Sequence, residues 1–154
     1  MALGPDRKCV YEDMLDGRPL RVIEVTAMTM IANVPARVPV QCFYEWEAPD
    51  WPVTRLKRRR WLTRLLRKPT GLLFEEATFN QWFTVDAEDE DFTIALLGVE
   101  MQKHLLTKTS VEWTIGGGAI KLFYGGGWKK SRMPGTVERL LAFWELVPIE
   151  MQDW

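Results

Sequence analysis

The sequence predicts an α+β protein: a mostly antiparallel sheet of about six strands, with three amphipathic helices packed on one face. Two observations support this prediction. Several segments alternate apolar and polar residues and are separated by turns rich in Gly or Pro, which is typical of antiparallel strands. Other segments repeat apolar residues at helical spacing. The chain has 154 residues, 47% of them hydrophobic, so residues 1–154 can form one domain with its own core.

The N-terminal third predicts a long antiparallel pair of strands. Residues 1–20 are polar and irregular and end in a turn, DGRP. The next run alternates and places these residues on one face: Ile23, Val25, Ala27 and Ile31. After the interruption NVPAR, a second run places another set on one side: Val38, Val40, Cys42, Tyr44 and Trp46. Residues 53–57 fit either a third strand or the start of the next helix.

The middle of the chain predicts a basic helix followed by two strands. Residues 59–68 fit a helix because Leu62, Leu65 and Leu66 follow the i, i+3, i+4 spacing, and Pro69 ends it. Residues 71–76, GLLFEE, are expected to form a short strand. Residues 78–89, TFNQWFTVDAED, are expected to form a longer strand with three residues facing one way: Phe79, Phe83 and Val85.

The C-terminal part predicts helices around a hairpin. Asp89 or Asp91 suits the N-cap of a helical segment, residues 92–106, which Gly98 bends or divides. Residues 110–127 contain two apolar strands around a glycine turn. A final helix begins near Pro134 and ends before Pro148, with apolar residues at i, i+3, i+4 and i+7. The helices expected to cover the sheet contain WLTRLL, FTIALL and VERLLAFW.

Composition favours a soluble, cytoplasmic protein. Two cysteines form neither a disulfide framework nor a tetrahedral zinc site, so a reducing compartment is expected. The N-terminus becomes charged before any apolar core of a signal peptide develops. The longest apolar stretch, residues 22–34, contains Glu24 and is too short to span a bilayer.

Charge is polarised along the sequence, although the formal net charge is only −1. Residues 55–68 contain eight basic residues and no acidic one, whereas residues 75–91 contain seven acidic residues and no basic one. The simplest interpretation is that the two blocks face each other or water.

No pattern of catalytic residues is recognisable, and we expect no enzyme, cofactor or metal. His104 is the only histidine, and Cys42 alternates with apolar neighbours as a core residue does. The run DAEDED lacks the central Gly of a calcium loop and suits a helix start instead. GGGWKKS departs from the phosphate-loop spacing. An enzyme stays open only if a deep pocket gathers acids from DAEDED or around Glu45 and Glu47.

Two functional hypotheses follow. The first is a non-enzymatic protein–protein interaction or regulatory module that docks through exposed Trp and Arg side chains, the usual anchors of such contacts. Trp51 and Trp154 are further candidates for this role, because each lies beside a break or a terminus. The alternative is a binder of anionic surfaces, membrane lipid or nucleic acid, through the basic 55–68 helix. The candidate contact residues are Arg58, Arg59, Arg60, Trp61, Arg64, Arg67, Trp128, Lys129 and Lys130.

Residues 78–106, TFNQWFTVDAEDEDFTIALLGVEMQKHLL, followed by VEWTIGGGAIKLF, resemble an uncharacterised family of actinobacterial proteins without an assigned activity. Its members are similar in their Phe-Asn start to an aromatic strand, acidic helix entry, Leu-Leu pair, glycine-turned hairpin and terminal helix. Many members carry an N-terminal membrane anchor before this region. The resemblance therefore implies a soluble or bacteriophage-encoded member without the anchor. The shared motifs are structural and imply no catalytic residues.

Overall fold

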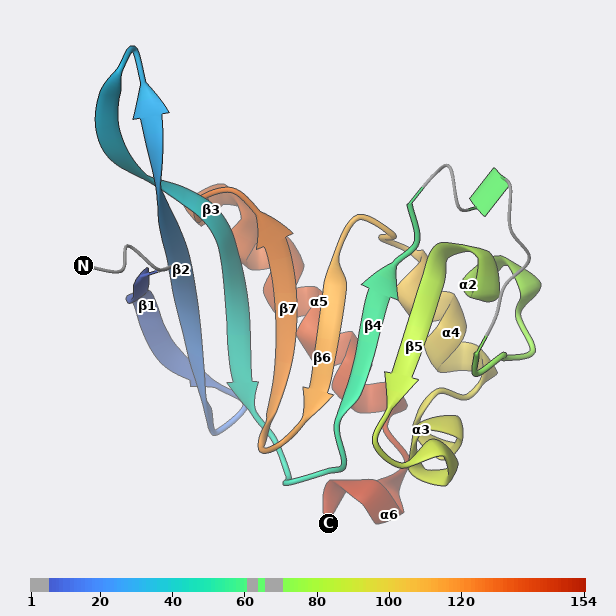
Figure 1. Cartoon of the computed structure of the whole chain (residues 1–154). Coiled ribbons are helices and arrows are strands. Elements are labelled where there is room, and N and C mark those ends of the chain that lie inside the picture. Colours follow the sequence, from blue (N-terminus) through green and yellow to red (C-terminus); the bar gives the residue numbers. More distant parts are fainter. Residues whose placement is uncertain (1–5, 61–63, 66–70) are drawn as a thin grey trace.

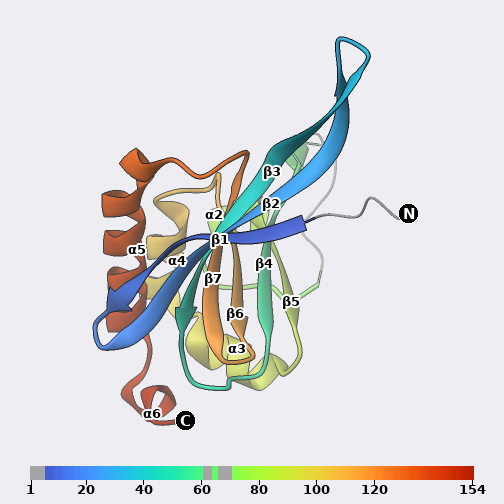
Figure 2. The same cartoon turned by 90° about the vertical axis from the view of Figure 1, so that its left-hand side faces the viewer.

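A computed structural model describes residues 6–60, 64–65 and 71–154, which form one seven-stranded antiparallel sheet with helices on one face (Figure 1; Figure 2). The strands are β1 (Asp6–Leu15), β2 (Arg18–Ile31), β3 (Val34–Glu47), β4 (Thr54–Arg58), β5 (Phe83–Ala87), β6 (Glu112–Gly116) and β7 (Ala119–Gly125). The helices are α2 (Ala77–Trp82), α3 (Glu90–Leu96), α4 (Val99–Leu106), α5 (Met133–Leu146) and α6 (Ile149–Gln152), with a 3-10 turn η1 (Lys130–Arg132).

The strand order is β1-β2-β3-β7-β6-β4-β5, and every neighbouring pair is antiparallel. The predicted α+β class is confirmed, with seven strands instead of about six. No helix within the described residues is long and apolar enough to cross a bilayer.

The prediction that residues 1–20 are irregular was wrong for the described part of that segment. Residues Asp6–Leu15 form β1, which pairs with β2 along the edge of the sheet. Most side chains of β1 are exposed, so no apolar alternation marks the strand in the sequence. Backbone hydrogen bonds join β1 to β2, and they form equally well in a polar sequence.

The predicted grouping of apolar residues in β2 is confirmed, because the alternation of the strand is unbroken, but the face they share is the one opposite the helices. Leu20 and Val22 are buried and face the helices. Ile23, which pairs with Phe43, lies on the opposite face, and so does Val25, which is also buried. Ile31 lies at the far end of β2 and is 54% exposed. A one-residue change in strand phase moves every side chain to the other face, and here residues of both phases are apolar.

The predicted face of β3 is half correct. Cys42, Tyr44 and Trp46 are fully buried, but Val40 is exposed. The reason is a bulge: Gln41 pairs with Val25 while Pro39 pairs with Thr26, so Val40 has no partner and the alternation shifts there.

The basic segment begins as a strand, so the strand alternative for residues 53–57 is confirmed and the prediction of one basic helix over residues 55–68 is corrected. Thr54 and Leu56 are buried while Arg55 and Lys57 are exposed, the period-two pattern of β4. Arg64 is helical, together with the residue that follows it. The rest of the predicted helix, residues 61–63 and 66–68, lies outside the described residues, as does its WLTRLL segment apart from these two positions.

Residues 71–82 also differ from the predicted strands. The Asn80 side chain accepts a hydrogen bond from the Phe74 N–H at 2.8 Å and donates to the Phe74 carbonyl at 2.7 Å. These bonds occupy both backbone groups that a strand partner would use. The segment up to Trp82 therefore forms a loop and then α2, with Phe79 buried, and only Phe83 begins a strand.

The C-terminal predictions are confirmed. Asp89 caps α3 by accepting a hydrogen bond from the Phe92 N–H at 3.1 Å, and Gly98 separates α3 from α4. β6 and β7 form the glycine-turned hairpin, and α5 ends before Pro148. The core lies between the sheet and α4 and α5, where Trp113 stacks on Phe143 with ring centroids 5.0 Å apart.

Candidate functional site

The face of the sheet opposite α4 and α5 carries no helix among the described residues (Figure 2). One row of paired positions crosses the sheet on this face and alternates in charge along most of its length. The row consists of Glu12, Arg21, Glu45, Lys121, Thr114, Arg55 and Asp86.

Ion pairs neutralise much of this row. Glu45 pairs with Arg21 and also lies 3.8 Å from the Lys121 ammonium. Lys57 lies 3.6 Å from Asp86, so the strand part of the basic block does face the acidic block, as the simplest interpretation expected. Exposed pairs of this kind contribute about 0–1 kcal/mol each. The row therefore favours this strand register only weakly and leaves little unbalanced charge.

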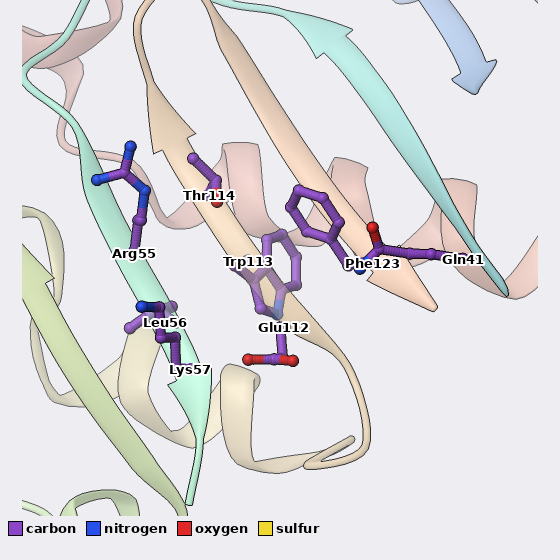
Figure 3. Close-up of a pocket in the computed structure, with 8 residues that line it drawn as sticks. All are labelled: Gln41, Arg55, Leu56, Lys57, Glu112, Trp113, Thr114 and Phe123. Carbon is purple, nitrogen blue, oxygen red and sulfur yellow. The ribbon is translucent and has the colours of Figure 1, made fainter. Parts of the chain in front are cut away.

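A shallow hollow of about 160 Å³ lies on this face between β7, β6 and β4 (Figure 3). Phe123, Thr114 and Arg55 line it from adjacent strands, and Glu112 lies at one end, where its carboxylate accepts a hydrogen bond from the Arg58 N–H at 3.2 Å. Sites for small organic ligands are usually about 300–1,000 Å³. The hollow is too small for such a ligand.

A second depression, of about 320 Å³, contains the acids singled out in the sequence, Glu45 and Glu47, together with Glu12. Its polar lining includes Arg21, whose ion pair with Glu45 occupies that carboxylate. The DAEDED acids lie elsewhere, around the start of α3. Among the described residues no group of three or more His, Cys, Asp or Glu side chains is placed to hold a metal ion.

The most distinctive surface is a projecting arm, residues 27–38, formed by the ends of β2 and β3 (Figure 1; Figure 2). Within the described residues, β1 pairs with β2 as far as Thr26 and β7 pairs with β3 as far as Gln41; beyond these points β2 and β3 have no other described strand partner. Ala32 and Asn33 form the tip in left-handed conformations, with φ of 50° and 64°.

Apart from Asn33, the tip of the arm is apolar. Met30, Ile31 and Val34 are 62%, 54% and 61% exposed. The only charged residue in the arm is Arg37. Two-stranded ribbons are marginally stable in water without packing on another surface. An arm of this composition therefore has the properties of a docking element.

The loop after β7 forms hydrogen bonds with residues at the base of the arm. The Gly126 N–H donates to the Val40 carbonyl at 3.0 Å, and the Trp128 N–H donates to the Glu24 carboxylate at 3.0 Å. The Trp128 indole N–H donates to the Tyr44 hydroxyl at 3.2 Å. Trp128 is therefore a half-buried structural side chain.

Five exposed cations, here called the collar, surround the base and side of the arm. None of the five makes an ion pair with another described residue. They come from the start of β1, from the arm itself and from the loop after β7: Arg7, Lys8, Arg37, Lys129 and Lys130. Two acids lie in the same region: Asp6 pairs with Thr26 in register, and Glu24 pairs with Lys8 in register while its carboxylate accepts a hydrogen bond from the Trp128 N–H.

The opposite end of the sheet is acidic, and we call it the acidic end. It comprises the β1–β2 turn, the end of β3, the connections into β4 and α3, and α6 (Figure 1). Its exposed acids are Asp16, Glu47, Asp50, Glu88, Asp89, Glu90, Asp91, Glu150 and Asp153. The small net charge therefore conceals a strong polarity along the strands.

The structure separates the candidate contact residues of the sequence. Arg58 and Arg60 are exposed, but Arg59 is buried and donates to the Asn80 carbonyl at 3.1 Å. Arg64 is half-buried and stacks on Trp82, its guanidinium carbon 3.7 Å from the ring centre. Lys129 and Lys130 lie in the collar. Trp61 and Arg67 lie outside the described residues.

Two further tryptophans had been candidate anchors. Trp51 is fully buried, and its indole N–H donates to the Met151 carbonyl at 2.8 Å, so its role as an anchor is excluded. Trp154 is exposed and packs edge-on against Phe92.

Cys42 and His104 have internal contacts, whereas the other free cysteine, Cys9, is exposed. Cys42 is buried, as predicted, and burial raises the pKa of its thiol, which lowers its reactivity. His104 Nε2 lies 3.1 Å from the Arg139 carbonyl. Burial lowers the pKa of His104, so the neutral ring is favoured.

Sequence reasoning predicted the antiparallel pair but not the arm, because apolar residues at the ends of two strands do not show whether other strands flank them. One signal was present: residues 27–38 are apolar in both strand phases and contain a single charge. A strand that packs on one side only alternates more strictly.

Comparison of the chain with protein-family models, curated proteins and solved structures finds no match. The resemblance to the actinobacterial family therefore stays a prediction.

Proposed function

We propose that the protein is a non-enzymatic interaction module that docks onto a larger partner through the arm. The observation that carries this proposal is the exposed apolar tip, Met30, Ile31 and Val34, on a ribbon with no described packing beyond its base. Contiguous apolar surface that is exposed on a monomer often marks the site where a partner binds.

The sequence favoured a protein partner contacted through Trp and Arg side chains. Trp51 and Arg59 are buried, and the Trp128 indole is hydrogen-bonded within the protein. We therefore expect the partner to contact the arm and not these three side chains. A second candidate, binding to an anionic surface, is favoured by the five unpaired cations of the collar. In either case the arm end is the contact surface.

The test compares the tagged protein with the variant Met30→Ser, Ile31→Ser, Val34→Ser in the native cell. We expect the unaltered protein to migrate with a large complex or with membranes, and the variant to migrate as a free monomer. The three side chains are exposed, so the free energy of unfolding should change by less than about 1 kcal/mol.

The matched control removes apolar surface at the acidic end, with Ile94→Ser and Ile149→Ser, which are 47% and 75% exposed. The control should migrate like the unaltered protein. Identical migration of the unaltered protein and the arm variant would show that the arm is not the docking surface.

A further inference from the structure

We propose that the partner of the arm is a membrane surface containing anionic lipids: the arm tip enters the interfacial layer and the collar is attracted to the head groups. This inference rests on the proposed docking function and names the chemical class of the partner. It depends on three observations: the composition of the tip, the position of the cations, and the backbone of the arm.

The tip has the composition of an interfacial anchor. Met30 and Ile31 come from one strand and Val34 from the other, so both strands present apolar side chains at the end of the ribbon. Met30 pairs with Pro35, and Ile31 pairs with Val34 directly across the turn. An apolar tip of this size gains free energy from the acyl boundary without spanning the bilayer.

One cation of the collar lies within the arm, and the others lie at its base. Arg37, within the arm, lies closer to the tip, whereas Arg7 is opposite Val25, about 20 Å along β2 from Ile31. Lys8 is the next residue in β1, and Lys129 and Lys130 follow the loop that packs against Pro39. The cations at the base of the arm therefore act on the leaflet through their electric field, which reaches furthest at low salt. Each cation close to an anionic leaflet strengthens binding, and the effect of the collar adds to that of the tip.

The arm is poorly suited to recruit another strand, which argues against a second copy or an extended peptide on its β3 edge. Pro35 and Pro39 lie within the arm strand and at its base. A proline has no N–H and fits only where its nitrogen faces away from the paired strand, so both interrupt the donors of the free edge. A fluid lipid surface needs no such donors.

Charge polarity orients the molecule. Along β2, the acidic β1–β2 turn lies seven residues below Val25, which corresponds to about 23 Å. The Debye length at physiological ionic strength is about 8 Å, so repulsion between these acids and an anionic membrane is screened. The collar therefore faces the surface while the acidic end points away.

The experiment measures co-sedimentation of the protein with vesicles of phosphatidylcholine alone and with vesicles that also contain about 30% phosphatidylglycerol, in low salt where anionic attraction is strongest. We expect binding to the phosphatidylglycerol vesicles only, falling steeply as salt is added. Lys8→Gln, Lys129→Gln, Lys130→Gln should weaken the partition coefficient about a hundredfold, and the tip variant should weaken it at least about tenfold.

Two controls separate these effects from general loss of charge or apolar surface. Arg55→Gln, Lys57→Gln, Lys103→Gln removes the same charge away from the arm, and Ile94→Ser with Ile149→Ser removes apolar surface at the acidic end. Both should bind like the unaltered protein. A fluorophore on Ile31→Cys, in a Cys9→Ser background, should shift to shorter wavelength with the vesicles, whereas one on Ile149→Cys should not.

The lipid assignment is overturned by absence of vesicle binding at low salt, by equal binding of the tip variant, or by preference for a DNA or RNA oligonucleotide over the vesicles. The proposed docking function has its own readout. If the arm variant is released from its complex in cells while vesicles do not bind, the arm docks on another partner. If neither result appears, both proposals fail.

Discussion

Single side chains join elements that are distant in the sequence. The Arg18 guanidinium at the start of β2 lies between the rings of Trp46 and Trp144, 3.8 Å from each ring centre, and donates to the Glu47 carbonyl at 3.0 Å. Burial lowers the pKa of Arg18, and its ordinary value is high enough to keep the group charged. Arg18 therefore fastens the sheet to α5 by cation–π contacts.

His104 gives the clearest pH dependence at this scale. Burial is the main cause of its lowered pKa, and the nearby Arg139 charge also disfavours the imidazolium. The unfolded chain therefore takes up a proton near the ordinary pKa of 6.5, whereas the folded protein does so only at lower pH. Stability is complete above that pH and falls as pH decreases through the window between the two values.

We expect urea denaturation to show this loss in the unaltered protein between pH 7.5 and about pH 5.5, a range in which few other side chains titrate. His104→Gln should flatten the dependence, because it removes the only histidine. An equal slope in the variant would assign the pH dependence to other groups.

At the scale of elements, close contacts between backbone atoms restrict which residues can stand in a turn. Gly116, at the end of β6, has φ of 115°, and a Cβ there would lie 2.5 Å from the Pro52 carbonyl oxygen and 2.8 Å from that of Trp51. The Gly117 N–H donates to this Trp51 carbonyl at 2.9 Å. The β6–β7 hairpin is thus held against the β3–β4 connection.

Gly116→Ala should therefore destabilise the protein by about 2–5 kcal/mol, because it combines backbone strain with a clash against backbone atoms. Gly125→Ala is the control: no atom lies within 4 Å of its Cβ position, and the expected change is below about 1 kcal/mol. Chemical denaturation measures both. Similar stability of the two variants would contradict the close approach seen at Gly116.

At the scale of the whole molecule, the separation of positive and negative charge to opposite ends matters more for binding to a charged surface than the net charge does. The collar and the exposed cations Arg58 and Arg60 lie toward the arm end of the strands, and nine acids lie toward the other. Binding to a charged surface depends on the local potential, because charges beyond a Debye length are screened.

The protein should therefore be retained on a cation exchanger at pH 7 in low salt, although its formal net charge is −1. Retention should weaken in Lys8→Gln, Lys129→Gln, Lys130→Gln and should change less in Arg55→Gln, Lys57→Gln, Lys103→Gln, whose β4 cations lie near Asp86. The salt concentration at elution measures the effect. Elution of the unaltered protein in the flow-through would show that the acidic end dominates.

Sequence reasoning succeeded where local chemistry decides the structure. The Asp89 cap, the division at Gly98 and the hairpin around Gly117 follow from hydrogen bonding and backbone freedom within a few residues. It failed at β1 and at residues 71–82, where the outcome depends on a distant strand or on the Asn80 side chain.

The same division applies to the candidate site. The sequence identified Lys129 and Lys130 as exposed cations, because charge is expensive to bury. It could not show that they lie near Arg7 and the arm, because strand order brings those segments together.

By itself, the sequence determined the α+β class, the antiparallel pairing of its longest strands and the terminal helix, since periodicity and turn chemistry are local properties. Only the tertiary structure decided that the apolar residues at the end of β2 are exposed, that the basic segment begins as a strand, and that cations and acids separate to opposite ends. Sheet order and strand phase are set by contacts between distant residues, which no local pattern encodes.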